Sequence, residues 1–325
     1  MKRLLFVTMA TAIGLVGCDK SERAPEPKPA PTATPTPAPA PAPTVAPAAA
    51  AEDPWKNEGP KKDPLKRPLL WSIEKGGTTS YALGTIHVGV DAEARLPALV
   101  WDKLDAAPAF AMESDLTDPA LQRVLECVKC SLRKELGEKH WAKLEEVLGK
   151  ATAERIDGMK PMVAATMLSL HGLPTTTQMD GLLLARAQNG KKKVVYLEAA
   201  KDAAKVLEKW MNVKALKAML EDFEGSKRNT QQLLEAYVAG DDEKMVTLAS
   251  EERKQALKHG YTEAELEEQM ADMLYNRNAA WLPAIEKLHA EGGGFIAVGA
   301  LHLVGPKSVL EMLAGKGYKI VRLTP

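Results

Sequence analysis

The stretch Phe295-Ile296-Ala297-Val298-Gly299-Ala300-Leu301-His302 decides the fold, because it joins an apolar strand directly to a histidine. Phe, Ile and Val favour strands, so residues 295–298 predict a buried one. Gly299 then permits a tight turn or a close backbone approach at the end of the strand. The Gly-x-x-His spacing predicts that His302 projects from the carboxyl edge of a sheet, where open α/β sheets bind their ligands.

The same pattern occurs a second time, near the start of the folded part. Tyr81-Ala82-Leu83-Gly84-Thr85-Ile86-His87 again ends a short strand in Gly-x-x-His, with Gly84 in the glycine position. A further glycine follows each histidine, at Gly89 and Gly305. The two turns therefore predict two histidines at the rim of one sheet.

Two more expected strands end in a carboxylate. Residues 109–112 run into Glu113, and residues 194–197 run into Glu198. If these strands are neighbours, two imidazoles and two carboxylates share one rim, and such groups are the usual ligands of divalent Zn, Mn, Co or Fe. One carboxylate would instead serve as general base for a metal-activated water. A histidine after a strand is also a common structural residue, so both interpretations stand.

Other polar side chains also have two interpretations each. Arg277 would hold an anionic group or stabilise an oxyanion, or else form a structural ion pair with Glu113 or Glu198. Asp180 precedes an apolar helix, which favours an N-cap over a place in the site. Glu198 would ligate a metal or cap the following helix. Four histidines lack the glycine context and are interpreted as structural: His140, His171, His259 and His289.

The rest of the chain alternates strands with helices. Residues 69–73 and 81–83 flank Gly76-Gly77, which predicts a hairpin. Thr262-Glu263-Ala264-Glu265 matches a capping box and opens a long helix that ends near residue 290. We therefore predict an α/β (α+β) domain over residues 68–325, in which a central mixed β-sheet is flanked by helices and carries a large helical insertion.

The N-terminus has the pattern of a bacterial lipoprotein signal. Lys2 and Arg3 precede an uncharged apolar stretch, residues 4–16, that is shorter than the roughly 20 residues of a spanning helix. It ends in Leu15-Val16-Gly17-Cys18, which resembles a lipobox. We expect residues 1–17 to be removed and Cys18 to carry acyl chains such as palmitate, which bind a membrane. A plain secretory signal is the alternative.

A tether is expected to follow, because residues 24–51 are almost entirely Pro, Ala and Thr. Such a segment buries too little apolar surface to fold, and its prolines favour extended polyproline II. Residues 18–67 would thus hold the domain away from the membrane. The expected location is the bacterial cell envelope, lipid-anchored and extracytoplasmic, on the periplasmic side or at the surface.

Composition narrows the partners. Lys plus Arg and Asp plus Glu both number 43, and aromatic residues make up only 5%, so neither a basic face nor a base-stacking surface for nucleic acid is expected.

Cys127 and Cys130 form a Cys-x-x-Cys pair inside a helical-looking run. An oxidising envelope favours a structural disulfide between them, and redox exchange is the alternative.

Taken together, these motifs resemble the TraB/GumN family over about residues 68–324. The resemblance rests on the two Gly-x-x-His runs and on five shorter matches: Leu70-Trp71-Ser72-Ile73-Glu74-Lys75, Met159-Lys160-Pro161, Asp180-Gly181, Leu197-Glu198 and Arg277-Asn278-x-x-Trp281. That family includes Tiki, a membrane-tethered metalloprotease, and is related to erythromycin-esterase-like and haem-binding ChaN-like proteins. The resemblance implies an active-site set of His87, His302, Glu113 and Arg277, with Mn or Co as the metal.

The expectation is a metal-dependent hydrolase, foremost a peptidase, that acts on an extracytoplasmic peptide or protein. His87, His302 and Glu113 would hold the metal, which would be Mn or Co, with Zn as a further candidate. Glu198 or Glu113 would act as base and Arg277 would orient the substrate. The alternative is a non-catalytic envelope protein that sequesters a peptide, haem or a metal.

Overall fold

The computed structural model describes residues 63–325, apart from 88, 116, 119–124, 126, 128, 174–177 and 258–259. The expected signal peptide, the lipidated Cys18 and all of the tether before residue 63 lie outside the described residues, as does His259. Within the described part, none of the helices combines the length and the apolar character needed to cross a bilayer.

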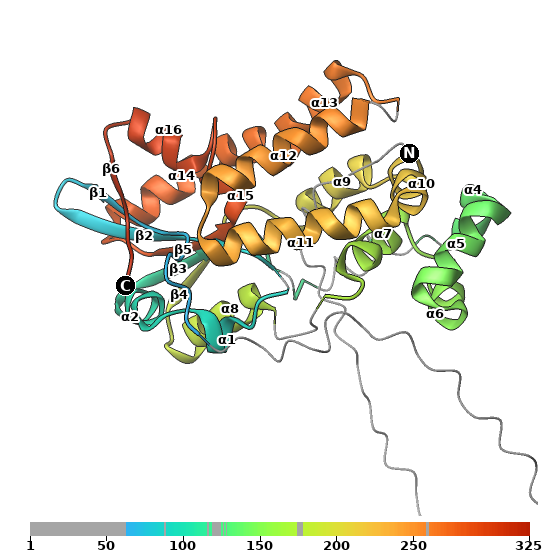
Figure 1. Cartoon of the computed structure of the whole chain (residues 1–325). Coiled ribbons are helices and arrows are strands. Elements are labelled where there is room, and N and C mark those ends of the chain that lie inside the picture. The colour runs from blue at the N-terminus through green and yellow to red at the C-terminus, as the bar shows by residue number, and fades with distance from the viewer. Residues whose placement is uncertain are drawn as a thin grey trace, which may run out of the picture.

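Six strands form one mixed sheet, as predicted, in the order β4-β3-β5-β2-β1-β6 (Figure 1). The central strands β3, β5 and β2 are parallel, β4 is parallel to β3, and β1 is antiparallel to both β2 and β6. Parallel strands end at the same edge, so the residues that follow β2, β3, β4 and β5 meet there. The strands are β1 (Leu70–Lys75), β2 (Thr78–Thr85), β3 (Ala109–Met112), β4 (Lys193–Tyr196), β5 (Phe295–Gly299) and β6 (Lys319–Arg322).

The hairpin of β1 and β2 is confirmed, and it is longer than predicted. Lys75 pairs with Thr78, so only Gly76 and Gly77 form the turn. Both glycines have positive φ, +60° and +80°, which is the conformation that a two-residue hairpin turn requires. The turn therefore sets the register that carries Gly84 and Thr85 to the carboxyl end of β2.

Helices cover both faces of the sheet and continue beyond it. In Figure 1, α14 and α16 lie on one face and α2 and α8 on the other. The helices near the sheet are α1 (Ala92–Arg95), α2 (Ala98–Ala106), α8 (Met179–Asn189), α11 (Phe223–Ala239), α12 (Asp242–Leu257), α14 (Asn276–Ala290), α15 (Ala300–Leu303) and α16 (Val309–Gly315). Beyond them lie α4 (Leu132–Leu136), α5 (Glu138–Leu148), α6 (Lys150–Arg155), α7 (Pro161–Leu170), α9 (Ala200–Trp210), α10 (Val213–Glu221) and α13 (Glu263–Met270).

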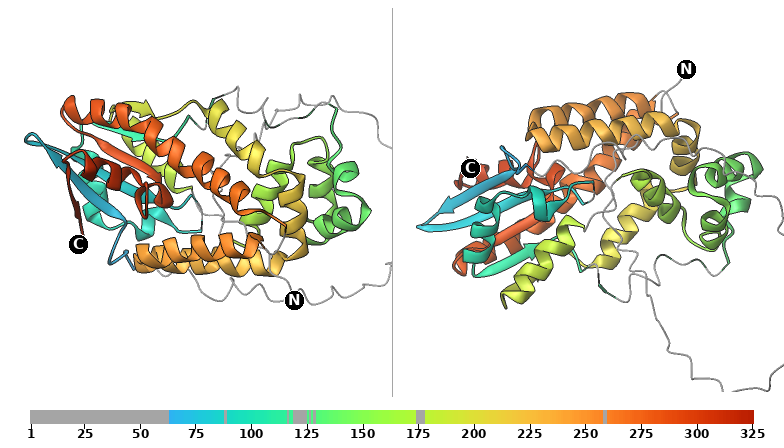
Figure 2. Two further views of the ribbon diagram at one scale, coloured as in Figure 1. Left: turned by 90° about the horizontal axis from the view of Figure 1, so that it is seen from above. Right: turned by 60° about the horizontal axis from the view of Figure 1, so that its bottom comes forward.

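The protein has two main hydrophobic cores. The larger one fills the space between the sheet and its helices, with Phe110 and Phe295 stacked at its centre. The second lies within the helical insertion and includes Trp141, Met162 and Leu216. Both views in Figure 2 place α4, α5 and α6 at the end of the molecule opposite the sheet. The insertion therefore has an apolar interior of its own.

The structure differs from the sequence-based prediction in three elements. Helix α12 was not predicted, because most of its residues are charged or polar. The long helix after the capping box, which is confirmed, contains a π-helical turn, η1 (Ala271–Tyr275), between α13 and α14. His302 lies on the one-turn helix α15 and not on an irregular turn.

Candidate functional site

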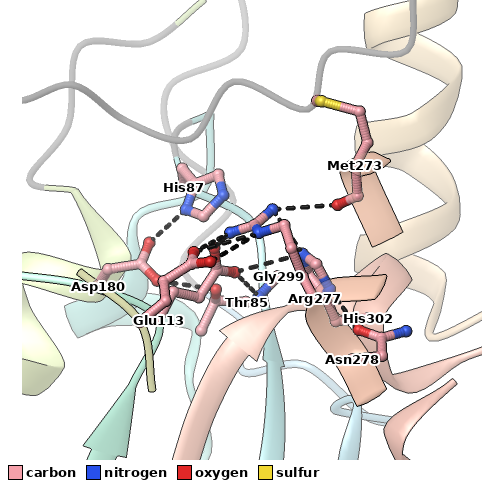
Figure 3. A network of polar contacts seen from close by, with 10 residues as sticks. Thr85, His87, Glu113, Asp180, Met273, Arg277, Asn278, Gly299 and His302 are labelled. Atoms are coloured by element: carbon pink, nitrogen blue, oxygen red, sulfur yellow. Dashed lines mark hydrogen bonds and ion pairs between the residues drawn. The ribbon is translucent and has the colours of Figure 1, made fainter. Parts of the chain in front are cut away.

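The predicted site residues gather at the carboxyl edge of the sheet. His87 follows β2, Glu113 follows β3, Glu198 follows β4, and His302 lies on α15 directly after β5. Arg277 reaches the same place from the first turn of α14. Figure 3 shows the resulting network, in which side chains from distant parts of the sequence point toward one another.

Gly299 is the point on which three of these side chains converge. A Cβ atom added there would lie 3.2 Å from Glu113 Oε1, 3.5 Å from His302 Cδ2 and 3.7 Å from His87 Nε2. The Gly299 amide donates a hydrogen bond of 2.7 Å to Glu113 Oε1. A cavity of about 50 Å³ lies beside this point and is bordered by all three side chains and by Arg277. The first glycine of the second motif thus keeps the centre of the site open.

Arg277 joins the two carboxylates in a buried ion pair. Its guanidinium donates to Glu113 Oε2 at 2.8 Å and to both oxygens of Glu198. It also donates a hydrogen bond of 3.1 Å to the Met273 carbonyl. The guanidinium lies over the ring of Trp281, with 5.0 Å between Arg277 Cζ and the ring centroid. The structure therefore realises the ion-pair interpretation with both candidate partners at once.

The π-helical turn carries one of these contacts. In η1, hydrogen bonds run from residue i to i+5, as from the Asn276 amide to the Ala271 carbonyl. The Met273 carbonyl lies in this turn and accepts from the guanidinium of Arg277. The Met273 side chain packs into the second core, so the same residue links the helical insertion to the site.

His302 is held as a neutral ring. A guanidinium only donates, so Nε2 accepts from Arg277 Nη1 at 3.3 Å. Nδ1 then carries the proton and donates 2.6 Å to Asn278 Oδ1. Burial disfavours the charged ring and lowers the pKa of His302. The negative charge of Glu113 acts to raise this pKa and the positive charge of Arg277 to lower it, and the result is a pKa of about 3.

His87 is held as a positively charged ring. Its Nδ1 lies 2.8 Å from Asp180 Oδ2. The other oxygen of Asp180 accepts a hydrogen bond of 2.9 Å from the Thr85 hydroxyl. Burial alone would lower the pKa of His87, but the charge and hydrogen bond of Asp180 outweigh it and raise the pKa to about 9. The N-cap interpretation of Asp180 was therefore wrong: α8 begins after Gln178, and the Asp180 carboxylate reaches across to the sheet.

The two carboxylates also differ. Burial would raise the pKa of Glu113, but the His302 ring, Arg277 and His87 lower it to about 2, so Glu113 is ionised. Burial raises the pKa of Glu198, and the charge of Glu113 adds to that effect. Glu198 does not cap the next helix, because α9 begins after Ala199 without a side-chain cap.

Sequence reasoning missed two residues that hold the imidazoles in place. Asn278 is 1% exposed and binds both His302 and, through Nδ2, the Lys307 carbonyl at 2.9 Å. Thr85 was quoted only as part of a motif, yet its hydroxyl holds Asp180. The one available signal was position: Asn278 directly follows Arg277, and Thr85 lies between Gly84 and His87.

The remaining predicted residues lie away from the site. Cys127 and Cys130 are joined in a disulfide with 5.3 Å between Cα atoms, and neither lies in a helix. His289 is buried and shares a hydrogen bond of 2.9 Å with Ser80, whereas His140 contacts Glu221. His171 packs its ring on Phe223. These histidines link elements of the fold to one another.

The donor set is compatible with a divalent ion. Both imidazoles bind an oxygen acceptor through Nδ1, which is the second-sphere pattern of metal-binding histidines. His302 Nε2 accepts from Arg277 and would exchange that hydrogen bond for the ion. His302 Nε2 lies 3.8 Å from Glu113 Oε1, within the roughly 4.2 Å that can separate two ligands each about 2.1 Å from one ion. Among the described residues, however, no three His, Cys, Asp or Glu side chains enclose an ion as they stand.

Comparisons with known proteins identify the domain. No curated protein and no solved structure matches the chain. A family model, that of the TraB/PrgY/gumN family, matches residues 69–322. This match spans all six strands and every site residue, and it confirms the resemblance seen in the motifs. The chain therefore belongs to the TraB/PrgY/gumN family.

Proposed function

We propose that this protein is a metal-dependent hydrolase that cleaves peptide bonds in an extracytoplasmic peptide or protein. The observation that supports it is the convergence of His87, Glu113 and His302 on the open point at Gly299. These three residues would hold the metal, with Mn or Co expected and Zn as a further candidate. A bound divalent ion supplies a Lewis acid and a water of lowered pKa.

The protein's own residues have distinct roles in this proposal. Glu113 is ionised and borders the cavity, so it is the carboxylate placed to bind the ion or to take a proton from water. Arg277 also borders the cavity and would orient a carbonyl or carboxylate of the substrate. Glu198 lies behind Arg277 and would hold the guanidinium in position.

The test combines metal analysis with hydrolysis of a peptide library. Purified protein is loaded with Mn, Co or Zn, and the variants His87→Ala and His302→Ala are expected to lose both bound metal and hydrolysis. His140→Ala removes a histidine far from the site and serves as the matched control. Glu113→Gln separates its two roles, because a base variant keeps the metal whereas a ligand variant loses it. Unchanged metal content and hydrolysis in both histidine variants would contradict the proposal.

A sequestering protein gives a different result in the same experiment. It would bind metal or peptide in a fixed stoichiometry and release no cleaved product. Envelope tethering through Cys18 is a separate proposal, and it concerns residues outside the described ones. Labelling cells with a palmitate analogue tests it, since Cys18→Ala is expected to abolish both the label and membrane association.

A further inference from the structure

The cavity beside the site is lined by both polar and apolar side chains. The polar ones are Thr85, His87, Glu113, Arg277 and His302. Two of the apolar ones, Leu233 and Met245, come neither from the strand ends nor from the histidine turns. They belong to α11 and α12, two helices that run side by side as a hairpin (Figure 1). The hairpin therefore contributes part of the lining of the site.

Helix α11 is anchored on the first histidine turn. The Tyr237 hydroxyl donates a hydrogen bond of 2.9 Å to the carbonyl of Gly84, the first glycine of that turn. Leu234 packs on Gly89 so closely that a Cβ atom added there would lie 2.8 Å from its side chain. Leu233, next in sequence to Leu234, borders the cavity. Its position is thus set by contacts on the turn that carries the first imidazole.

Helix α12 is anchored on the second histidine turn in the same way. Val246 lies against Gly305, where an added Cβ atom would come within 3.0 Å of its side chain. Asp242, at the start of α12, pairs with Arg322 of β6 at 3.4 Å. Met245 is 1% exposed and faces the cavity. Each helix of the hairpin therefore supplies one apolar side chain to the cavity from a rigid support.

The size of the cavity limits what it can accept. One water needs roughly 10–15 Å³ of such space, and the cavity has about 50 Å³. The proposed ion would take part of this space, and what is left is room for the few heavy atoms of a small aliphatic side chain and not for an aromatic ring. A charged side chain would lose its hydration against Leu233 and Met245 without gaining a partner from either residue.

We propose that Leu233 and Met245 determine substrate specificity at this site by receiving a small aliphatic side chain beside the bond that is cleaved. The inference rests on the proposed hydrolase function and adds its substrate class: peptides with Ala or Val next to the cleaved bond. A pocket of this kind discriminates by roughly 10-fold or more for each methylene that it fits or rejects.

The test compares residue preference in wild-type protein and cavity variants. Metal-loaded full chain is given peptides that differ only at one position, with Ala, Val, Leu, Phe or Lys, and products are located by mass spectrometry. We expect wild-type protein to favour Ala and Val over Phe and Lys. Leu233→Ala and Met245→Ala enlarge the cavity and are expected to shift preference toward Leu and Phe by about 10-fold. Leu248→Ala removes apolar volume from the same helix outside the cavity, so preference should stay unchanged.

A binding measurement keeps this inference separate from the hydrolase proposal. The same peptides, labelled with a fluorophore, are titrated into metal-free wild-type protein and the three variants, and anisotropy reports affinity without turnover. If no peptide is hydrolysed, the proposed function fails, and a variant-dependent shift in binding preference still supports the pocket. If neither wild-type assay shows a preference for Ala and Val, or if Leu233→Ala and Met245→Ala leave it unchanged while circular dichroism shows them folded, the inference is overturned.

Discussion

The two Gly-x-x-His turns share one sequence pattern, yet they hold their imidazoles in opposite electrical states. In the first turn the Asp180 carboxylate raises the pKa of His87 to about 9. In the second turn burial and the Arg277 guanidinium lower the pKa of His302 to about 3. In the metal-free protein at neutral pH, the first ring is therefore charged and the second is neutral.

This difference shows that the motif determines where an imidazole lies, whereas its neighbours determine its charge. Each turn carries its ring to the same edge of the sheet. The residues behind the rings come from elsewhere, Asp180 from α8 and Asn278 from α14. A carboxylate stabilises a charged ring and an amide does not, so equal motifs give unequal sites. Substitutions that exchange or remove these neighbours should therefore remove the asymmetry.

The largest predicted effect follows from removing Arg277, which serves the second turn. Arg277→Met removes the guanidinium that pairs with both of the buried carboxylates, Glu113 and Glu198, and we expect the free energy of unfolding to fall by about 3–5 kcal/mol. Denaturant unfolding of metal-free protein measures it. Arg253 also pairs with two glutamates, but near the surface, so Arg253→Met should cost only about 0–1 kcal/mol. Equal losses in the two variants would contradict the buried network.

The first glycines of the two turns should also respond differently. A Cβ atom at Gly84 would lie 3.0 Å from the Ala300 Cα atom and 3.2 Å from Leu69 Cβ, where the backbone cannot move aside cheaply. We expect Gly84→Ala to lower the free energy of unfolding by about 1–3 kcal/mol. Gly299→Ala instead adds a methyl group among the site side chains. It should cost less stability but abolish metal uptake, as measured by calorimetric titration.

Two outcomes would contradict the predictions for Gly84 and Gly299. If Gly299→Ala binds metal as wild-type protein does, the open point above that residue is not where His87, Glu113 and His302 bind an ion. If Gly84→Ala is as stable as wild-type protein, the contact between β2 and α15 is looser than the distances to Ala300 indicate.

The asymmetry also explains which parts of the site could be predicted from the sequence. The strand, the glycine and the histidine are local neighbours, so the positions of His87 and His302 at one edge could be expected. The pairing of β2 with β5 is not local, and it brings the two motifs side by side. The charges of the rings depend on Asp180 and Asn278, whose side chains could equally have served a helix end or the surface.

Local and non-local contributions also separate the parts of the fold that could be predicted from those that could not. The sheet could be predicted because its strands are short apolar runs next to glycines, as at Gly76 and Gly77. Helix α12 could not, because fewer than half of its residues are apolar and its main partner is another helix, α11. The π-helical turn η1 also lacked a sequence signal, since Ala271–Tyr275 continues a helical pattern without a break.

Substitution of Asp180 should have an intermediate effect, and it tests the first turn. Asp180→Asn keeps the shape of the side chain but removes the charge behind His87. We expect the pKa of His87 to fall from about 9 toward the ordinary value near 6.5, and the free energy of unfolding at pH 7 to fall by about 1–2 kcal/mol. Histidine NMR titration reports the pKa. Asn278→Asp is the converse variant and should raise the pKa of His302. An unchanged His87 pKa in Asp180→Asn together with an unchanged His302 pKa in Asn278→Asp would contradict the role of these neighbours.

Within a single pH unit, the smallest predicted effect is a pH dependence of stability with opposite signs for the two rings. The raised pKa of His87 means that its contribution is complete below about pH 6.5 and is lost as the pH rises through about 9. The lowered pKa of His302 means that its contribution is present above about pH 6.5 and is lost as the pH falls toward about 3. Metal-free wild-type protein should therefore lose stability on both sides of pH 6.5, by less than about 1.4 kcal/mol for each pH unit from each ring. Denaturant unfolding in the presence of a chelator measures the profile, and Asp180→Asn should remove the alkaline loss while keeping the acid one, since only His87 depends on that carboxylate.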